Sequence, residues 1–330
     1  MTGRSLALRA VIAAALFAAV ILLLGQLVPG AGKRLADAQP GWLVLAVGLE
    51  LAACGGYAAL FHAVFAREPY PISGRRSTQI ALAELGGFAI VPAGVGGPAA
   101  RIWGLRRAGM SWRTLWVRTV SHAPVFNAPY IAAALVLGLG VVFNAGPGNA
   151  PLAVALAPAG LVVVALLVIL AVTVVVRLRW LDRPRGWRHS LREALRVVPA
   201  GIRDTPEVLR DPRALLGAVA YWAGDCAVLW AGFHAVGSVP PLGVIVLGYM
   251  LGQLGNAIPL PGGVGGVEPV MLGVLTASGV GTAVGAAAIV CYRAIALGVQ
   301  SGLGAIAFAT LAPEIGKPRA DRADSADSAG

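Results

Sequence analysis

Six long apolar stretches constrain this chain more than any other feature, because each is long enough to cross a lipid bilayer as a helix. Only 12% of the residues are charged and 58% are hydrophobic, whereas about a quarter of the residues in a soluble domain are charged. Lipid must therefore be the solvent for much of the surface. The six stretches are Ala10 to Val28, Gly41 to Phe65, Thr114 to Phe143, Pro151 to Val176, Ala214 to Val236 and Thr282 to Leu311.

Two further apolar regions, Thr78 to Gly109 and Leu242 to Ser278, are broken by proline and glycine. Proline removes a helical hydrogen bond and glycine lowers helix propensity, so each region predicts two half-helices around a turn. Half-helices of about 12 to 17 residues would be roughly 18 to 25 Å long, shorter than the ~30 Å hydrocarbon core. The interrupting residues are Pro92, Gly94, Gly96, Gly97 and Pro98 in the first region, and Pro259, Pro261, Gly262, Gly263, Gly265 and Gly266 in the second.

The two broken regions match one another and indicate an internal duplication. Leu85 aligns with Leu254 at a shift of 169 residues (254 minus 85), and at this shift PAGVGG aligns without a gap with PGGVGG. The same shift carries the second apolar stretch onto Arg210 to His234. We therefore predict a single integral membrane domain over residues 1–317, with one repeat at about 10–143 and a second at about 151–311.

The distribution of arginine predicts how the repeats are oriented. If each broken segment enters and leaves on the same side, each repeat crosses the membrane three times, so the two copies face in opposite directions. With a cytoplasmic N-terminus, the ten arginines from Arg177 to Arg213 are then cytoplasmic, and only Lys33 and Arg34 are external. Full crossing by the broken segments would place the ten-arginine loop outside, against the cytoplasmic bias of basic loops. We expect an all-α polytopic inner-membrane protein with six transmembrane helices, two re-entrant half-helix hairpins in an inverted repeat, and both termini cytoplasmic.

The basic loop at 177–213 carries an amphipathic pattern. Apolar side chains recur at helical spacing on one face and arginines at i, i+4 spacing on another, so the segment can lie at the membrane interface against anionic headgroups. A solvated loop is the alternative that this pattern leaves open. The net charge of +11 thus reflects membrane orientation and indicates no nucleic-acid partner. The polar tail at 318–330 is expected to be disordered. The apolar residues are Leu191, Ala194, Leu195 and Val198, and the arginines are Arg188, Arg192 and Arg196.

Ionisable residues within the apolar stretches are the candidates for chemistry. Each costs at least ~2.5 kcal/mol at a helix centre, so it normally faces a partner or a wet cavity. No hydrolase elbow, P-loop or zinc-binding spacing is present, and we predict no metal or cofactor. The intramembrane ionisable residues are Glu50, Glu84, Arg118, Asp225, Glu268 and Arg293.

Two of these residues, Glu268 and Arg293, are the strongest candidates. Glu268 follows the second proline and glycine turn, and Arg293 lies in the middle of the last apolar stretch. An intramembrane arginine can bind a phosphate, and a carboxylate can pair with it or hold a cationic headgroup. A buried ion pair that only fixes helix packing is the alternative. Glu84 and Arg118 lie near the ends of apolar stretches, where snorkelling towards the interface is an alternative explanation.

The broken segments supply a second kind of candidate. Helices that stop inside the membrane leave backbone N–H groups that can bind anions, and two such breaks from opposite faces imply a central polar cavity with alternating access. The candidate substrate-binding residues are Glu268, Arg293, Pro261, Gly262, Gly263, Gly265, Asn256, Glu84, Arg101, Arg118 and Asp225.

One sequence run resembles a known family. The segment GNAIPLPGGVGGVE from Gly255 to Glu268, followed by Cys291, Tyr292 and Arg293, resembles the flippase-type membrane domain of lysylphosphatidylglycerol synthetases and its stand-alone relatives. The likeness covers about 41–311 and implies translocation of a lipid or lipid-linked sugar, with Glu268 and Arg293 at matching positions. The chain ends soon after the last apolar stretch, so we expect no soluble aminoacyl-transfer domain and no synthetase activity.

The first repeat departs from this resemblance. Gly94 and Gly97 stand where the family pattern leads us to expect a basic residue and a glutamate, which leaves Arg101 as the nearest charge. This departure argues against a charge-based role for the first turn.

These observations predict a lipid flippase or transporter that moves a phospholipid or a lipid-linked amphiphile between leaflets. The expected partners are a membrane phospholipid or polyprenyl-linked lipid, anionic headgroups at the basic loop, and a possible second copy of the chain. A membrane-embedded transferase is one alternative, but it needs a metal-binding carboxylate cluster or a nucleophile with a base. An assembly partner of a separate lipid-modifying or glycosyl transferase, docked through the arginine-rich loop, is another.

Overall fold

The computed structural model describes residues 28–91, 95–142, 151–153, 156–160, 163, 187–257, 263 and 265–316. Within these residues every regular element is a helix. Four helices are long and apolar enough to cross a membrane, which makes the chain a multi-pass membrane protein. They are α3 (Pro40–Phe65), α6 (Trp112–Val142), α9 (Pro212–Ala235) and α12 (Thr282–Gly316), as the second, third, fifth and sixth apolar stretches predict. The first and fourth predicted spans lie largely outside the described residues.

Both broken regions form a pair of short helices. The first pair is α4 (Gly74–Ile90) and α5 (Gly96–Arg107), and the second is α10 (Leu242–Gln253) and α11 (Val267–Ala277), with the 3-10 turn η2 (Leu254–Ala257) after α10. The two short helices of each pair approach one another closely at glycine residues. A Cβ atom at Gly87 would lie 2.6 Å from the carbonyl oxygen of Gly96, and one at Gly255 would lie 2.3 Å from the carbonyl carbon of Gly266. Only a residue without a side chain allows the backbones to approach this closely.

The helix bounds of the two halves coincide at the 169-residue shift. The elements occur in the same order, and their ends differ by only a few residues. The shift carries α3 onto 209–234 beside α9 at 212–235, α4 onto 243–259 beside α10 and η2 at 242–257, α5 onto 265–276 beside α11 at 267–277, and α6 onto 281–311 beside α12 at 282–316.

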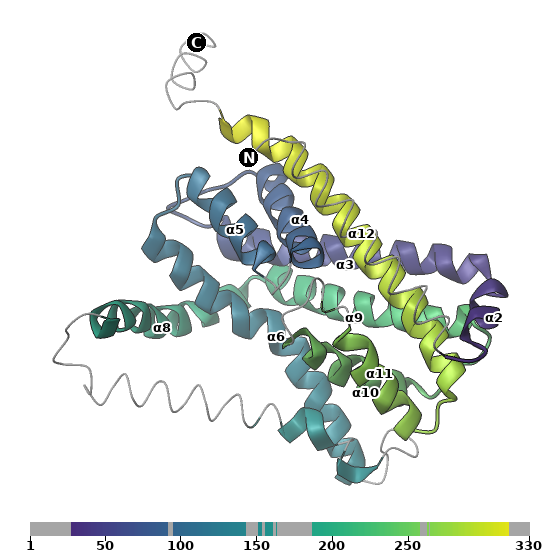
Figure 1. Cartoon of the computed structure of the whole chain (residues 1–330). Coiled ribbons are helices and arrows are strands. Elements are labelled where there is room, and N and C mark those ends of the chain that lie inside the picture. The colour runs from purple at the N-terminus through teal and green to yellow at the C-terminus, as the bar shows by residue number, and fades with distance from the viewer. Residues whose placement is uncertain are drawn as a thin grey trace.

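Helices α3 and α9 pack along one another at the centre of the molecule, with α4 and α5 on one side of them and α10 and α11 on the other (Figure 1). Small residues allow the close approach. A Cβ atom at Gly56 would lie 2.8 Å from the carbonyl oxygen of Gly217, and one at Gly217 would lie 2.6 Å from that of Gly56. Small residues at the contact are the usual way in which helices associate in lipid. Helix α12 crosses the molecule and contacts α3, α4, α9 and α11 (Figure 1).

Part of the basic loop is a helix, α8 (Trp187–Arg210), which packs against α6. A Cβ atom at Gly201 would lie 2.4 Å from the Cβ atom of Val120, so the two helices are in tight contact. The guanidinium group of Arg67 also binds the carboxylate of Asp204 at 2.6 Å. The amphipathic segment is thus helical and packs on α6, whereas the side chains of Leu191, Ala194 and Leu195 lie outside the described residues.

Candidate functional site

The second half holds a buried ion pair at its glycine turn. Glu268 lies in the first turn of α11, directly after that turn, and Arg293 lies near the middle of α12. The Nε atom of Arg293 donates to Oε1 of Glu268 at 2.7 Å, and the two side chains are only 6% and 5% exposed. The backbone N–H of Gly265 donates to the other carboxylate oxygen at 2.7 Å. Glu268 thus joins the glycine turn to α12 through both of its oxygens.

Asn256 lies against the same turn. Its amide donates to Oε1 of Gln253 at 2.7 Å, and the turn residue Gly263 has a φ of 66°. A Cβ atom at Gly263 would lie 2.1 Å from Oδ1 of Asn256, so the turn needs glycine both for its backbone conformation and for space. Gly265 has a φ of 85°, whereas Pro261 and Gly262 lie outside the described residues.

A chain of hydrogen bonds runs from this turn into the protein core. The amide of Gln253 donates to the hydroxyl oxygen of Tyr292 at 3.1 Å, and the Tyr292 hydroxyl donates to Oδ2 of Asp225 at 2.9 Å. The hydroxyl of Tyr249 donates to the same oxygen at 2.6 Å. Asp225 is 4% exposed, so its carboxyl group is buried with two hydroxyl donors. Asn256, Gln253, Tyr292 and Asp225 form a continuous polar path through apolar helices.

The first half also holds a buried ion pair, between two residues whose pairing the sequence analysis did not predict. A terminal nitrogen of Arg101 on α5 lies 3.3 Å from Oε1 of Glu84 on α4, with side chains 12% and 2% exposed. The Arg101 guanidinium group also lies over the ring of Phe65, 5.8 Å from its centroid. The 169-residue shift would carry Glu84 to Gln253 and Arg101 to Val270. Each half therefore has one Glu–Arg pair near its turn, at positions that are not equivalent.

Comparison with known families identifies the family of this chain. A family model described as the lysylphosphatidylglycerol synthase TM region matches residues 7–304, which include both broken segments, Glu268 and Arg293. The chain belongs to the lysylphosphatidylglycerol synthase TM region family. The resemblance found in the sequence is thereby confirmed, and it links the chain to a family associated with phospholipid handling in membranes. No curated protein matches the chain.

Arg118 has a structural role, because it binds backbone carbonyl groups. Its guanidinium group donates to the carbonyl oxygens of Phe65, Arg67 and Glu68 at 2.7, 2.7 and 2.8 Å. These carbonyl groups belong to the end of α3 and the loop after it, where a cation is favourable. Arg118 is 4% exposed and Glu84 is 1% exposed. The snorkelling explanation is therefore wrong for both, because protein atoms surround them.

Several polar residues of the site were missed by sequence reasoning. Tyr249, Tyr292 and Gln253 connect Asp225 to the turn, and Gln300 donates to Oε1 of Glu50 at 2.9 Å. Amide side chains inside apolar stretches are themselves costly. Gln253 and Gln300 could have been found by that signal. Tyr292 stood in the run that carries the family resemblance but was given no role, and Tyr249 gave no signal because tyrosine is common in apolar helices.

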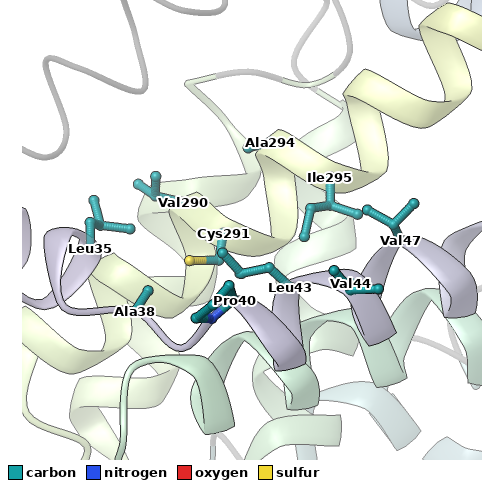
Figure 2. A pocket seen from close by; sticks show the side chains of 10 residues that line it. All are labelled: Leu35, Ala38, Pro40, Leu43, Val44, Val47, Val290, Cys291, Ala294 and Ile295. Atoms are coloured by element: carbon teal, nitrogen blue, oxygen red, sulfur yellow. The ribbon is translucent and has the colours of Figure 1, made fainter.

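A hydrocarbon-lined cavity of about 430 Å³ lies on one flank, between α2 (Ala31–Ala36), α3 and α12 (Figure 2). Its lining side chains are apolar, and Val44 at its edge is 72% exposed. The cavity is therefore suited to an acyl chain and not to a charged headgroup. Its lining residues are Leu35, Ala38, Pro40, Leu43, Val44, Val47, Val290, Cys291, Ala294 and Ile295.

Proposed function

We propose that this chain moves a phospholipid or a related anionic amphiphile between the two leaflets of the inner membrane. The observation that carries the proposal is the Glu268–Arg293 pair, buried beside the exposed end of a broken helix in a member of a phospholipid-handling family. A buried cation in lipid costs several kcal/mol, which makes an intramembrane arginine a candidate for function. A phosphate is the anion that an arginine fork fits best.

The proposed architecture is an inverted repeat of six spans and two re-entrant hairpins. Three observations support it: the matching helix bounds of the two halves, the lengths of the half-helices and the arginine distribution. Helices α4, α5, α10 and α11 have 17, 12, 12 and 11 residues. At 1.5 Å per residue they would be roughly 16 to 26 Å long, too short for the ~30 Å core. Pairs of short, opposed helices then bring irregular backbone to mid-membrane depth.

In the proposed cycle, a headgroup phosphate competes with Glu268 for Arg293. Glu268 keeps the N–H of Gly265 as a donor when the arginine turns to the phosphate. The carboxylate restores the ion pair when the lipid leaves, so the empty and loaded states differ in which anion Arg293 holds. The acyl chains stay in lipid, and the apolar cavity at α3 and α12 offers one of them a path along the protein.

We propose transport and not catalysis for this site. Glu268 accepts hydrogen bonds from an arginine and a backbone N–H, and Asp225 accepts them from two tyrosines and lies in contact with Glu50. Such contacts bind and orient charge, whereas a transferase needs a nucleophile next to a base or a metal-binding cluster.

We also place both termini and α8 on the cytoplasmic side. Helix α8 carries five of the ten arginines of the basic loop, and cytoplasmic loops are enriched in arginine. In that position the arginines lie near anionic headgroups, each worth about 1 kcal/mol of membrane attraction.

Reconstituted vesicles test the function. Purified protein in vesicles with a fluorescent phospholipid should make inner-leaflet lipid accessible to a membrane-impermeant quencher. Arg293→Gln keeps most of the side-chain volume but removes the charge, so it should slow the exchange roughly 10- to 100-fold, the equivalent of about 1.5–3 kcal/mol for charge-assisted hydrogen bonds. Arg67→Gln is the matched control, because it removes an arginine from a peripheral ion pair. Equal exchange by wild type and Arg293→Gln would refute the site, and a chemically altered lipid would favour a transferase.

Surface labelling tests the orientation separately. A cysteine introduced at Trp187, the first residue of α8, should react with an impermeant maleimide only in inverted vesicles. Reaction in intact spheroplasts would refute the inverted arrangement, whatever the transport assay shows.

A further inference from the structure

Two carboxyl groups meet at the contact between the equivalent helices α3 and α9. Glu50 lies near the middle of α3 and Asp225 near the middle of α9, and their residues are 0% and 4% exposed. Their side chains approach within hydrogen-bonding contact of each other. Close packing at Gly224 holds the helices at this depth, because a Cβ atom there would lie 2.9 Å from the Cβ atom of Ala53. The proposed exchange of Arg293 between Glu268 and phosphate does not use this pair.

Protein donors satisfy one oxygen of each carboxyl group. The amide of Gln300 donates to Oε1 of Glu50 at 2.9 Å, and the Cys54 thiol lies 3.7 Å from the same atom. The hydroxyls of Tyr249 and Tyr292 donate to Oδ2 of Asp225. The other two oxygens, Oε2 of Glu50 and Oδ1 of Asp225, are buried without a protein donor among the described residues.

A single proton accounts for both unpartnered oxygens. Two ionised carboxylates in contact would repel one another in a low dielectric, and each would leave a buried acceptor without a donor. One proton placed between them forms an O–H···O⁻ bond that satisfies both atoms at once. The donors from Gln300, Cys54 and the two tyrosines then stabilise the one remaining negative charge.

The groups around the pair are consistent with one net negative charge. Arg293 contributes a cation near Asp225, but its Nε is engaged by Glu268. The titratable groups that face the pair are Cys54 of α3, Tyr221 and Cys226 of α9, Tyr249 of α10, and Tyr292 and Arg293 of α12.

We propose that Glu50 and Asp225 bind one proton between them and form a proton-binding site at the contact between α3 and α9. Loss of this proton sets two negative charges against each other across the contact between the two halves. A further step rests on the proposed function: if the halves move during transport, release of the proton favours their separation, and transport then depends on pH.

Infrared spectroscopy of the wild-type protein in lipid tests the site without any variant. We expect an absorption band of a protonated carboxyl group that shifts in heavy water. Glu50→Gln and Asp225→Asn should each lose this band, because the amide supplies the hydrogen bond that the proton had made. Glu207→Gln is the matched control and should retain it, since it removes an exposed carboxylate of a peripheral ion pair. Absence of the band from wild type, or its survival in the Glu50→Gln, Asp225→Asn double variant, would overturn the site.

Alkaline pH gives an independent readout. Raising the pH removes the shared proton and should lower the melting temperature of the wild type more than that of either single amide variant, because the variants have no shared proton to lose. An equal loss in all three would contradict the proposal. If the band behaves as expected but lipid exchange by the wild type has no pH dependence, the proton site stands and its link to transport is refuted.

Discussion

Replacing Gly86 with alanine should force α4 away from α12. A Cβ atom at Gly86 would lie 2.6 Å from the Cα atom of Gly304 and 3.1 Å from the carbonyl oxygen of Gln300. Carbon atoms pack at about 3.5–4.0 Å, so the helices must separate by roughly 1 Å. Such overpacking costs about 1–3 kcal/mol, and the higher helix propensity of alanine offsets about 0.5–1 kcal/mol of it. We expect a net loss of about 1 kcal/mol of stability.

Thermal unfolding of the purified protein in one detergent measures this loss. The matched control is Gly302→Ala, on α12, because a Cβ atom there meets nothing within 4 Å. Only helix propensity acts at that position, so the control should be as stable as the wild type or slightly more stable. The hydrogen bond between Gln79 of α4 and Thr310 of α12, 3.1 Å long, crosses the same contact and should weaken in Gly86→Ala. A melting temperature of Gly86→Ala equal to or above that of Gly302→Ala would refute the reasoning.

Three other substitutions test separate contacts. Arg118→Met leaves three carbonyl groups without their donor and should cost at least about 2 kcal/mol in thermal unfolding; an unchanged melting temperature would contradict its structural role. Gly263→Ala should reduce lipid exchange far more than Gly273→Ala, where a Cβ atom meets nothing within 4 Å, and equal exchange would argue against the strained turn. Asp204→Asn should speed proteolysis within α8 while costing at most about 1 kcal/mol, because it weakens the bond to Arg67; unchanged cleavage would show that the bond does not anchor α8.

Much of the fold was predictable because apolar length and helix breakers act locally. The stretch from Gly41 predicts α3, which begins at Pro40, and the stretch from Thr282 predicts the start of α12. The turns were equally clear, since proline and glycine change backbone behaviour whatever surrounds them. The ends were less predictable: α12 continues to Gly316, five residues beyond the predicted Leu311 (316 minus 311).

The pairing of side chains between helices was not predictable in the same way. Glu84 and Arg101 are 17 positions apart (101 minus 84). The hairpin of α4 and α5 was predicted, but nothing local indicates which side chains of the two helices face each other. Asp225 is bound by tyrosines from two other helices, so its environment depends on how three helices pack. The free-energy cost of an ionisable side chain in the membrane marked Asp225 as a candidate, but this cost does not indicate which residues bind it.

Arg118 is a residue whose environment the sequence position predicted wrongly. Its distance from the end of an apolar stretch favours snorkelling, yet the residue binds three carbonyl groups at the end of α3. Arg118 reaches those carbonyl groups only because α6 packs beside α3, which the order of residues along the chain does not reveal.

Native mass spectrometry of the gently extracted protein tests most directly whether Arg293 holds a lipid headgroup. Wild type should retain a phospholipid with an anionic headgroup, and Arg293→Gln should lose most of it, while Arg67→Gln, which alters a peripheral arginine, should retain as much as wild type. Equal retention by wild type and Arg293→Gln, or no bound lipid on either, would contradict the proposed binding site.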